Sequence, residues 1–135
     1  MSDLTVEIRW TGDLRFEAGG RSETSIPMDG DAVIGPSPME LLLMGLAGCM
    51  GIDVVDILRK MRVPLAGLAV RAEGVRRPDP PRRFEAVRLT YRVEGVPERD
   101  RVKLERAVDL SRDTYCSVLH TMQPDLDLEI LIEHG

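Results

Sequence analysis

Two cysteines are the residues of this chain whose chemistry stands out first. Cys49 lies in the apolar stretch LLLMGLAGCMGI, and Cys116 lies in the more polar stretch RDTYCSVLH. A free cysteine is often simply a small buried apolar side chain, which suits Cys49 better than Cys116. In a reducing compartment, two cysteines that can meet are more often redox-active or metal-binding than structural. We therefore treat Cys49 and Cys116 as one candidate site.

A metal site is one chemistry open to this pair. Cys116 and His120 are four residues apart, so on a helix they would lie one turn apart on the same face. A thiolate and an imidazole together suit zinc, and Cys49 with one acid would complete a thin ligand set. A metal site that contains Cys116 and His120 is therefore an alternative.

Redox chemistry is the other possibility, and it requires an ionised thiol. A free thiol has a pKa of about 8.5, so only a few per cent of it is ionised at neutral pH. Burial in an apolar wall lowers that fraction further, and the middle of a helix offers no help from the helix dipole. A redox-active Cys49 therefore needs a cation beside it.

The segment Ser37–Arg62 predicts the long helix that carries the first cysteine. Ser37, Pro38 and Glu40 have the spacing of a capping box with proline at the first helical position. An apolar run of 12 residues, Leu41–Ile52, then predicts a helix half that is buried on every side. Since the run is shorter than the roughly 18 to 20 residues that cross a bilayer, we expect a core helix and no membrane contact.

Three glycines, Gly45, Gly48 and Gly51, recur every three residues in this helix. Each costs about 1 kcal/mol of helix stability relative to alanine, so the stripe indicates that a second helix crosses closely there. The helix would also be about 36 Å long, more than a domain of this size needs for its own core. We therefore expect a homodimer in which a partner subunit packs on the helix.

Alternating apolar residues predict strands on both sides of the helix. In 4–10, Val6, Ile8 and Trp10 share one face, which predicts a half-buried strand that turns back at residues 11–13. The other predicted elements are a strand through Leu14 and Phe16, strands at 21–27, 68–75, 84–95 and 126–132, a loop at 28–36, an exposed arginine-rich turn at 76–83, an amphipathic helix at 97–110 and a helical turn at 115–122. The pattern predicts a single α+β domain over 1–135.

Composition limits the class of partner and the compartment. The 135 residues, 43% hydrophobic and 30% charged, suit one globular domain with its own core. A net charge of -5 argues against a surface that binds nucleic acid or an anionic membrane. Residues 1–20 lack the basic and apolar regions of a signal peptide, so we expect a cytoplasmic protein.

The strings PSPMELLLMGLAGCMGIDVVDILRKM and YCSVLHTM resemble the superfamily of osmotically inducible protein C and the organic hydroperoxide resistance proteins (OsmC/Ohr). The resemblance covers nearly the whole chain. It implies an α+β fold, with antiparallel sheets around a long buried central helix, and two chains intertwined into a homodimer. It also implies that no metal or organic cofactor takes part.

The resemblance implies a thiol peroxidase that reduces organic hydroperoxides or hydrogen peroxide. Carried over by motif, Cys49 would attack the peroxide oxygen and become a sulfenic acid, and Cys116 would condense with it to a disulfide. An external dithiol would then reduce that disulfide. A binding or redox-sensing protein that keeps the fold and both cysteines without fast turnover is the alternative in this family.

The resemblance also implies an arginine from the first hairpin that stabilises the thiolate. The turn at 11–13 has no arginine at its tip, so Arg15 is the nearest candidate, with Arg9 and Arg21 behind it. Each of the three is otherwise an ordinary charge on a strand surface.

The family orients this arginine with a glutamate ten residues before the cysteine, where this chain has Met39. Glu40 lies nine residues before Cys49, and at about 100° per residue it falls on the opposite face of the helix. Glu40 is thus expected to cap the helix, and an active-site role for it requires an irregular helix start or the other chain. Asp53, one turn after Cys49, is a nearer carboxylate.

Overall fold

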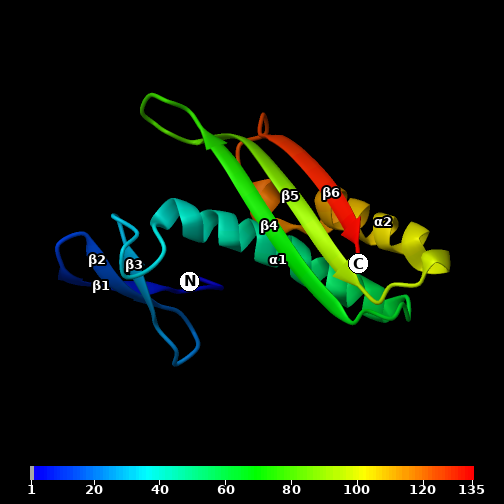
Figure 1. Cartoon of the computed structure of the whole chain (residues 1–135). Coiled ribbons are helices and arrows are strands. Elements are labelled where there is room, and N and C mark those ends of the chain that lie inside the picture. Colours follow the sequence, from blue (N-terminus) through cyan, green and yellow to red (C-terminus); the bar gives the residue numbers. More distant parts are fainter. Residues whose placement is uncertain (1) are drawn as a thin grey trace. The chain divides into compact units, whose positions relative to one another are not determined.

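The structure is a computed structural model that describes residues 2–135 (Figure 1). The chain forms two compact units, one that ends at Leu42 and one that runs from Leu43 to Gly135. The predicted helix, α1 (Pro38–Lys60), begins in the first unit and continues through the second.

The first unit contains a three-stranded antiparallel sheet in the order β1 (Glu7–Gly12), β2 (Arg15–Gly19) and β3 (Ile26–Asp29). The predicted turn after the first strand is confirmed, with Asp13 in the left-handed region at φ 46°. The prediction that the third strand covers 21–27 is wrong, because pairing with β2 begins only at Ile26. Residues 21–25 are polar and lack the alternation of a half-buried strand.

The apolar face of β1 is exposed within this chain. Ile8 and Trp10 on β1 are 49% and 65% exposed, and Val6 just before it is 77% exposed, so the prediction of a half-buried strand is wrong for the single chain. The alternation fits a strand, but among residues 2–42 no element covers this face. A continuous set of exposed apolar side chains is typical of a surface that meets another molecule.

The second unit contains a three-stranded sheet in the order β4 (Gly67–Arg76), β5 (Phe84–Glu94) and β6 (Asp127–His134). β4 and β5 are antiparallel, as predicted, whereas β5 and β6 are parallel. The expected α+β fold is confirmed, and the expectation of antiparallel sheets is wrong only for the β5–β6 pair, which makes this sheet mixed. A parallel pair needs a crossover connection, and the helices between β5 and β6 supply it.

The capping box at the start of α1 is confirmed. The Ser37 backbone N–H donates to Glu40 Oε1 at 3.0 Å, and the Glu40 N–H donates to Ser37 Oγ at 3.3 Å. The helix ends at Lys60, and Arg62 adopts the left-handed conformation at φ 58° while the Val63 N–H donates to the Leu58 carbonyl at 2.9 Å. This bond across the left-handed residue is the usual way to close a helix C-terminus.

The core of the second unit lies between the sheet and two helices. α1 and α2 (Arg101–Leu110) lie on the same face of the β4–β5–β6 sheet (Figure 1). Its fully buried side chains include Leu46, Met50, Val54 and Leu58 from α1, Leu104 and Ala107 from α2, and Leu89, Tyr91 and Val93 from β5. They recur every four residues on α1 and every two residues on β5, so each element buries one face.

The prediction that the first half of α1 is buried on every side is wrong for the single chain. Met44 is 54% exposed and Ile52 is 70% exposed. Among the described residues, α1 is the helix that is long and apolar enough to cross a membrane, with a mean hydropathy of 2.0 over 18 residues. Core helices of soluble proteins also meet this criterion. One apolar face of α1 is thus free in this chain.

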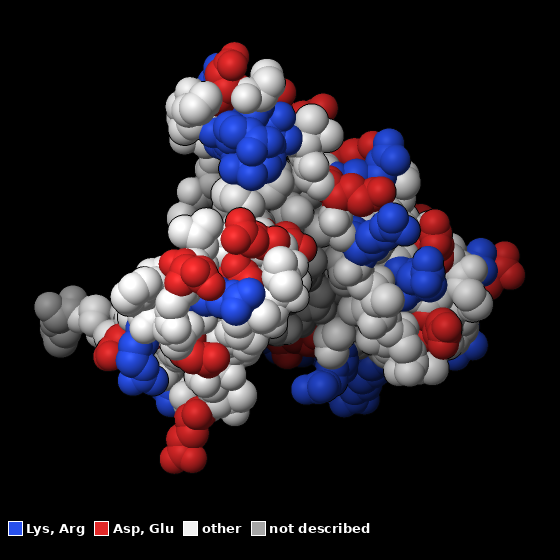
Figure 2. All heavy atoms as spheres, turned by 60° about the vertical axis from the view of Figure 1, so that its left-hand side comes forward, with Lys and Arg blue, Asp and Glu red and all other residues white. Residues whose placement is uncertain are grey.

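Charged side chains of both signs are interspersed over the surface in Figure 2. The arginine-rich segment 76–83 is an exposed turn between β4 and β5, as predicted. Arg83 pairs with Asp125 through two bonds of 3.1 and 3.0 Å, and Arg76 Nε donates to the Arg82 carbonyl at 2.7 Å. Two of the arginines in this segment, Arg76 and Arg83, thus make hydrogen bonds within the chain.

Candidate functional site

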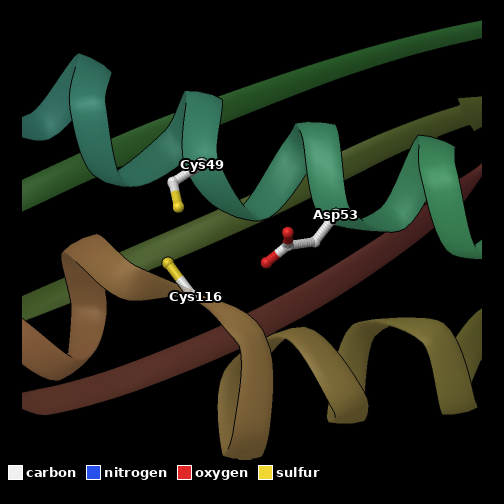
Figure 3. A group of neighbouring side chains, drawn as sticks. All are labelled: Cys49, Asp53 and Cys116. Atoms are coloured by element: carbon white, nitrogen blue, oxygen red, sulfur yellow. The ribbon is translucent and has the colours of Figure 1, made fainter. Parts of the chain in front are cut away.

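The second unit brings both cysteines and one carboxylate together (Figure 3). Cys49 and Asp53 lie one turn apart on α1, and Cys116 precedes α3 (Ser117–Thr121). The two sulfurs and a carboxylate oxygen of Asp53 all lie within 4.8 Å of one another. Residues 67 positions apart therefore meet, and the expectation that Asp53 is a nearby carboxylate is confirmed.

A π-helical turn, Ser111–Tyr115, places Cys116 opposite α1. The Cys116 backbone N–H donates to the Ser111 carbonyl at 2.8 Å, and the buried Ser111 Oγ donates to Asp53 Oδ2 at 2.9 Å. One turn thus holds both the second thiol and the partner of the carboxylate. Single π-helical turns are frequent at functional sites.

The two thiols differ in environment. Cys116 is fully buried, whereas Cys49 is partly exposed. The pKa of Cys116 is raised to about 11, chiefly by burial and to a smaller extent by the neighbouring Cys49 and Asp53. The Leu119 backbone N–H, which donates to Cys116 Sγ at 3.3 Å, acts in the opposite direction. Cys116 is therefore a protonated thiol at neutral pH, and Cys49 is the less buried cysteine of the pair.

Tyr91 of β5 brings a buried phenol to the same region. Its side chain is fully buried, and its hydroxyl has no hydrogen-bond partner among residues 2–135. Burial raises the pKa of Tyr91 well above its usual value, and the charges of Cys116 and Asp53 act in the same direction. The phenol is thus neutral and has a proton that it can donate.

The structure places the predicted arginine, Arg15, in the first unit. Arg15 Nε donates to Asp29 Oδ2 at 3.3 Å, and Asp29 is only 1% exposed. The Asp29 carboxylate also accepts hydrogen bonds from the backbone N–H groups of residues 31, 33 and 34. These bonds lower the pKa of the Asp29 carboxyl more than Arg15 does, and burial acts in the opposite direction. Among the described residues, Nε is the one guanidinium nitrogen of Arg15 that makes a hydrogen bond.

The other predicted residues have local roles in the structure. Glu40 belongs to the capping box, and the Ser37 N–H lowers the pKa of its carboxyl. An active-site role for Glu40 stays a prediction. Arg9 on β1 and Arg21 after β2 are exposed. His120 Nδ1 bonds the Cys116 carbonyl oxygen at 2.8 Å, so Asp53 and not His120 joins the two sulfurs in the cluster.

Sequence reasoning missed three residues near these groups. Tyr91 could have been found, because the alternation of 84–95 places it on the inward face with Leu89. Ser111 and Asp29 lie outside any periodic pattern, one in the π-helical turn and one where β3 enters a loop. Only tertiary contacts identify these two.

Two thiols and a carboxylate at these distances support two kinds of chemistry. The sulfurs are close enough for side-chain movement to bring them to the S–S bond length of about 2.05 Å. Alternatively, in their deprotonated forms, the three side chains offer the donor atoms that zinc prefers in proteins.

Comparisons with known proteins give a consistent result. The model of the OsmC-like protein family matches residues 29–130. The chain is 39% identical to Protein YhfA of Escherichia coli (strain K12) over 116 residues, 85% of this chain and 86% of YhfA. Among solved structures, a hypothetical protein from Aquifex aeolicus VF5 superposes with a TM-score of 0.87 at 33% identity, over 100% of this chain and 98% of that one.

The organic hydroperoxide resistance protein OhrB of Bacillus subtilis superposes with a TM-score of 0.64 at 15% identity, over 98% of both chains. At that identity the likeness concerns the fold alone.

Proposed function

Because the chain belongs to the OsmC-like protein family, we propose that it is a thiol-dependent peroxidase that reduces organic hydroperoxides or hydrogen peroxide through Cys49 and Cys116. The names of several proteins with this fold, including OhrB of Bacillus subtilis, refer to organic hydroperoxide resistance. The observation that supports the proposal most strongly is the approach of the two sulfurs within 4.8 Å of each other.

In the first step, the Cys49 thiolate attacks the distal oxygen of the hydroperoxide. An S–O bond forms, the O–O bond breaks, and the alkoxide leaves as the alcohol after it takes a proton. Cys49 becomes a sulfenic acid and the peroxide is reduced by two electrons. Cys49 suits this step better than Cys116 because it is the less buried residue of the pair.

In the second step, the Cys116 thiol must lose its proton before it attacks Cys49 Sγ. Since burial raises the pKa of Cys116, a neighbouring base has to take this proton, and Asp53 is within 4.8 Å. The S–S bond then forms and hydroxide leaves the sulfenic acid, taking the proton back as water. An external dithiol would reduce the disulfide and return both thiols.

Arg15 is our proposed cation for the Cys49 thiolate. The buried Asp29 carboxylate accepts the Nε–H of Arg15, which restricts the orientation of the guanidinium. The remaining guanidinium N–H groups would then donate to the anionic sulfur. In this proposal Asp29, and not Glu40, orients the arginine.

We also propose that the protein works as a homodimer in the cytoplasm. A Cβ added to Gly45 or Gly48 would meet nothing within 4 Å, whereas one added to Gly51 would lie 3.5 Å from Val70. Nothing within the described chain therefore approaches closely at Gly45 and Gly48. An open groove of about 610 Å³ follows this part of α1, lined on its apolar side by Gly48, Ile52, Val55, Leu68 and Val70. A second copy would cover it, whereas the charged residues Asp53, Asp56, Arg59 and Lys60 at the end of α1 disfavour a membrane.

The test is consumption of cumene hydroperoxide by the purified protein with a dithiol reductant. We expect steady turnover by the native chain and none by Cys49→Ser, because that change removes the attacking sulfur. Ser117→Ala, an exposed position beside Cys116, is the matched control and should turn over normally. Equal turnover by native protein and Cys49→Ser would remove the proposal, and no turnover by native protein would favour a binding or sensing role.

A further inference from the structure

We propose that the reduced protein has a binding site for a thiophilic divalent metal ion such as Zn²⁺, formed by Cys49, Asp53 and Cys116. Their donor atoms lie within 4.8 Å of one another. Metal binding in this form does not require peroxide turnover, so it goes beyond the peroxidase proposal although both use the same sulfurs.

The distances suit tetrahedral zinc. With Zn–S bonds of about 2.3 Å and a Zn–O bond of about 2.0 Å, the ligand atoms of a tetrahedral site lie roughly 3.5 to 3.8 Å apart. The limit of 4.8 Å exceeds this by about 1 Å. Small side-chain rotations therefore suffice to reach ligation distance, and the backbone keeps its conformation.

The three ligands are already held by regular structure. Cys49 and Asp53 are one turn apart on α1, and their side chains point toward Cys116 (Figure 3). The Leu119 N–H fixes Cys116 Sγ at the start of α3. Little conformational entropy is thus lost when an ion binds.

Two neighbouring hydroxyl groups, those of Ser111 and Tyr91, would support a bound ion as outer-shell hydrogen-bond donors. Ser111 Oγ donates to Asp53 Oδ2, an outer-shell contact of the kind that orients metal-binding carboxylates. The buried Tyr91 hydroxyl lacks a partner among residues 2–135 and would donate to a ligand thiolate or to a water molecule on the ion. A divalent cation would also offset the repulsion between two thiolates and a carboxylate.

Metal occupancy would depend on redox state. A disulfide between Cys49 and Cys116 forms when the two thiols lose two electrons and two protons to an oxidant, and it removes both sulfurs as thiolate ligands. The reduced chain would therefore bind the ion and the oxidised chain would release it. A bound ion would in turn keep peroxide away from Cys49.

The experiment is a titration of reduced, metal-free protein with Co²⁺, followed by competition with Zn²⁺. We expect one Co²⁺ per chain with thiolate-to-cobalt charge-transfer absorption, displaced by one equivalent of Zn²⁺. Ser111→Ala should weaken the affinity by roughly 10- to 100-fold, since it removes an outer-shell partner, and Asp53→Asn should weaken it more. Asp56→Asn, an exposed acid on the same helix, is the matched control and should leave it unchanged.

Three results would overturn the metal site. They are no charge-transfer absorption at one equivalent of Co²⁺, equal affinity in native protein and Asp53→Asn, or binding that persists after diamide has oxidised the two thiols. Circular dichroism verifies that each variant is folded, and Cys116→Ser is a second ligand variant that should lose the absorption. Peroxide turnover, measured separately with a chelator present, distinguishes failure of the peroxidase from failure of the metal site.

Discussion

At the scale of single residues, the contrast between the two thiols decides the order of the chemistry. Cys116 is buried and its pKa is raised to about 11, so it should react slowly with alkylating reagents at neutral pH. We expect iodoacetamide to modify Cys49 first, and Cys116 only as the pH approaches 11. Mass spectrometry of the digested protein measures this order, and faster labelling of Cys116 at neutral pH would contradict it.

The raised pKa of Cys116 also predicts how stability depends on pH. Because the unfolded chain loses the thiol proton at a lower pH than the folded chain, folding becomes less favourable as the pH rises from about 9 through about 11. Cys116→Ala should flatten this decline. Chemical unfolding of both proteins below pH 9 and near pH 11 checks it, and identical declines in the two would show that Cys116 does not contribute.

Asp53 is expected to act after the peroxide has been reduced. Asp53→Asn still accepts a hydrogen bond from Ser111 but is a far weaker base, so formation of the disulfide should slow by roughly 100-fold. The sulfenic acid on Cys49 should accumulate, and dimedone trapping measures it. Asp56→Asn is the control. Rapid disulfide formation in Asp53→Asn would show that a group other than Asp53 accepts the proton of Cys116.

At the scale of secondary structure, the capping box separates the two possible roles of Glu40. Ser37→Ala removes the hydroxyl that caps α1 and should cost about 1 kcal/mol of stability. Glu40→Gln retains an acceptor for the Ser37 N–H but loses the charge. If Glu40 only caps the helix, this variant should keep its peroxide turnover, and a large loss of turnover would show an active-site role.

The sequence predicted those elements whose signals are local. The capping residues and apolar run of α1, and the alternation in β4 and β5, correspond to observed elements, because short-range periodicity decides which face is buried. The parallel pairing of β5 with β6 has no such signal, since alternation does not specify the partner strand. The π-helical turn that places Cys116 was missed because no periodic pattern in the sequence marks it.

The candidate site was partly predictable. The cysteine pair and Asp53 followed from residue type and helical spacing. The contact of Ser111 with Asp53 joins segments 58 residues apart, and the contact of Asp29 with Arg15 depends on the pairing register of β2 and β3. The burial of the apolar residues was overestimated, as Ile52 and Trp10 show. A sequence pattern reports that a side chain avoids water without stating whether its own chain or another one covers it.

At the scale of the whole molecule, the exposed apolar side chains predict self-association. Ile52 is 70% exposed and lies in the groove beside Gly48. Ile52→Asp should place a charge in the proposed dimer interface and produce monomers, which light scattering measures. Val102→Asp changes a side chain of α2 that is 73% exposed and should leave the mass of the native assembly unchanged. A native protein that is monomeric would contradict the predicted homodimer.

The central claim is that peroxide joins Cys49 to Cys116 within one chain, and the intact mass of the reduced protein tests it most directly. After one equivalent of cumene hydroperoxide, we predict a mass lower by two hydrogen atoms and one peptide pair linked through these two cysteines. A chain that instead gains oxygen atoms on Cys49, with Cys116 still a free thiol, would contradict the account.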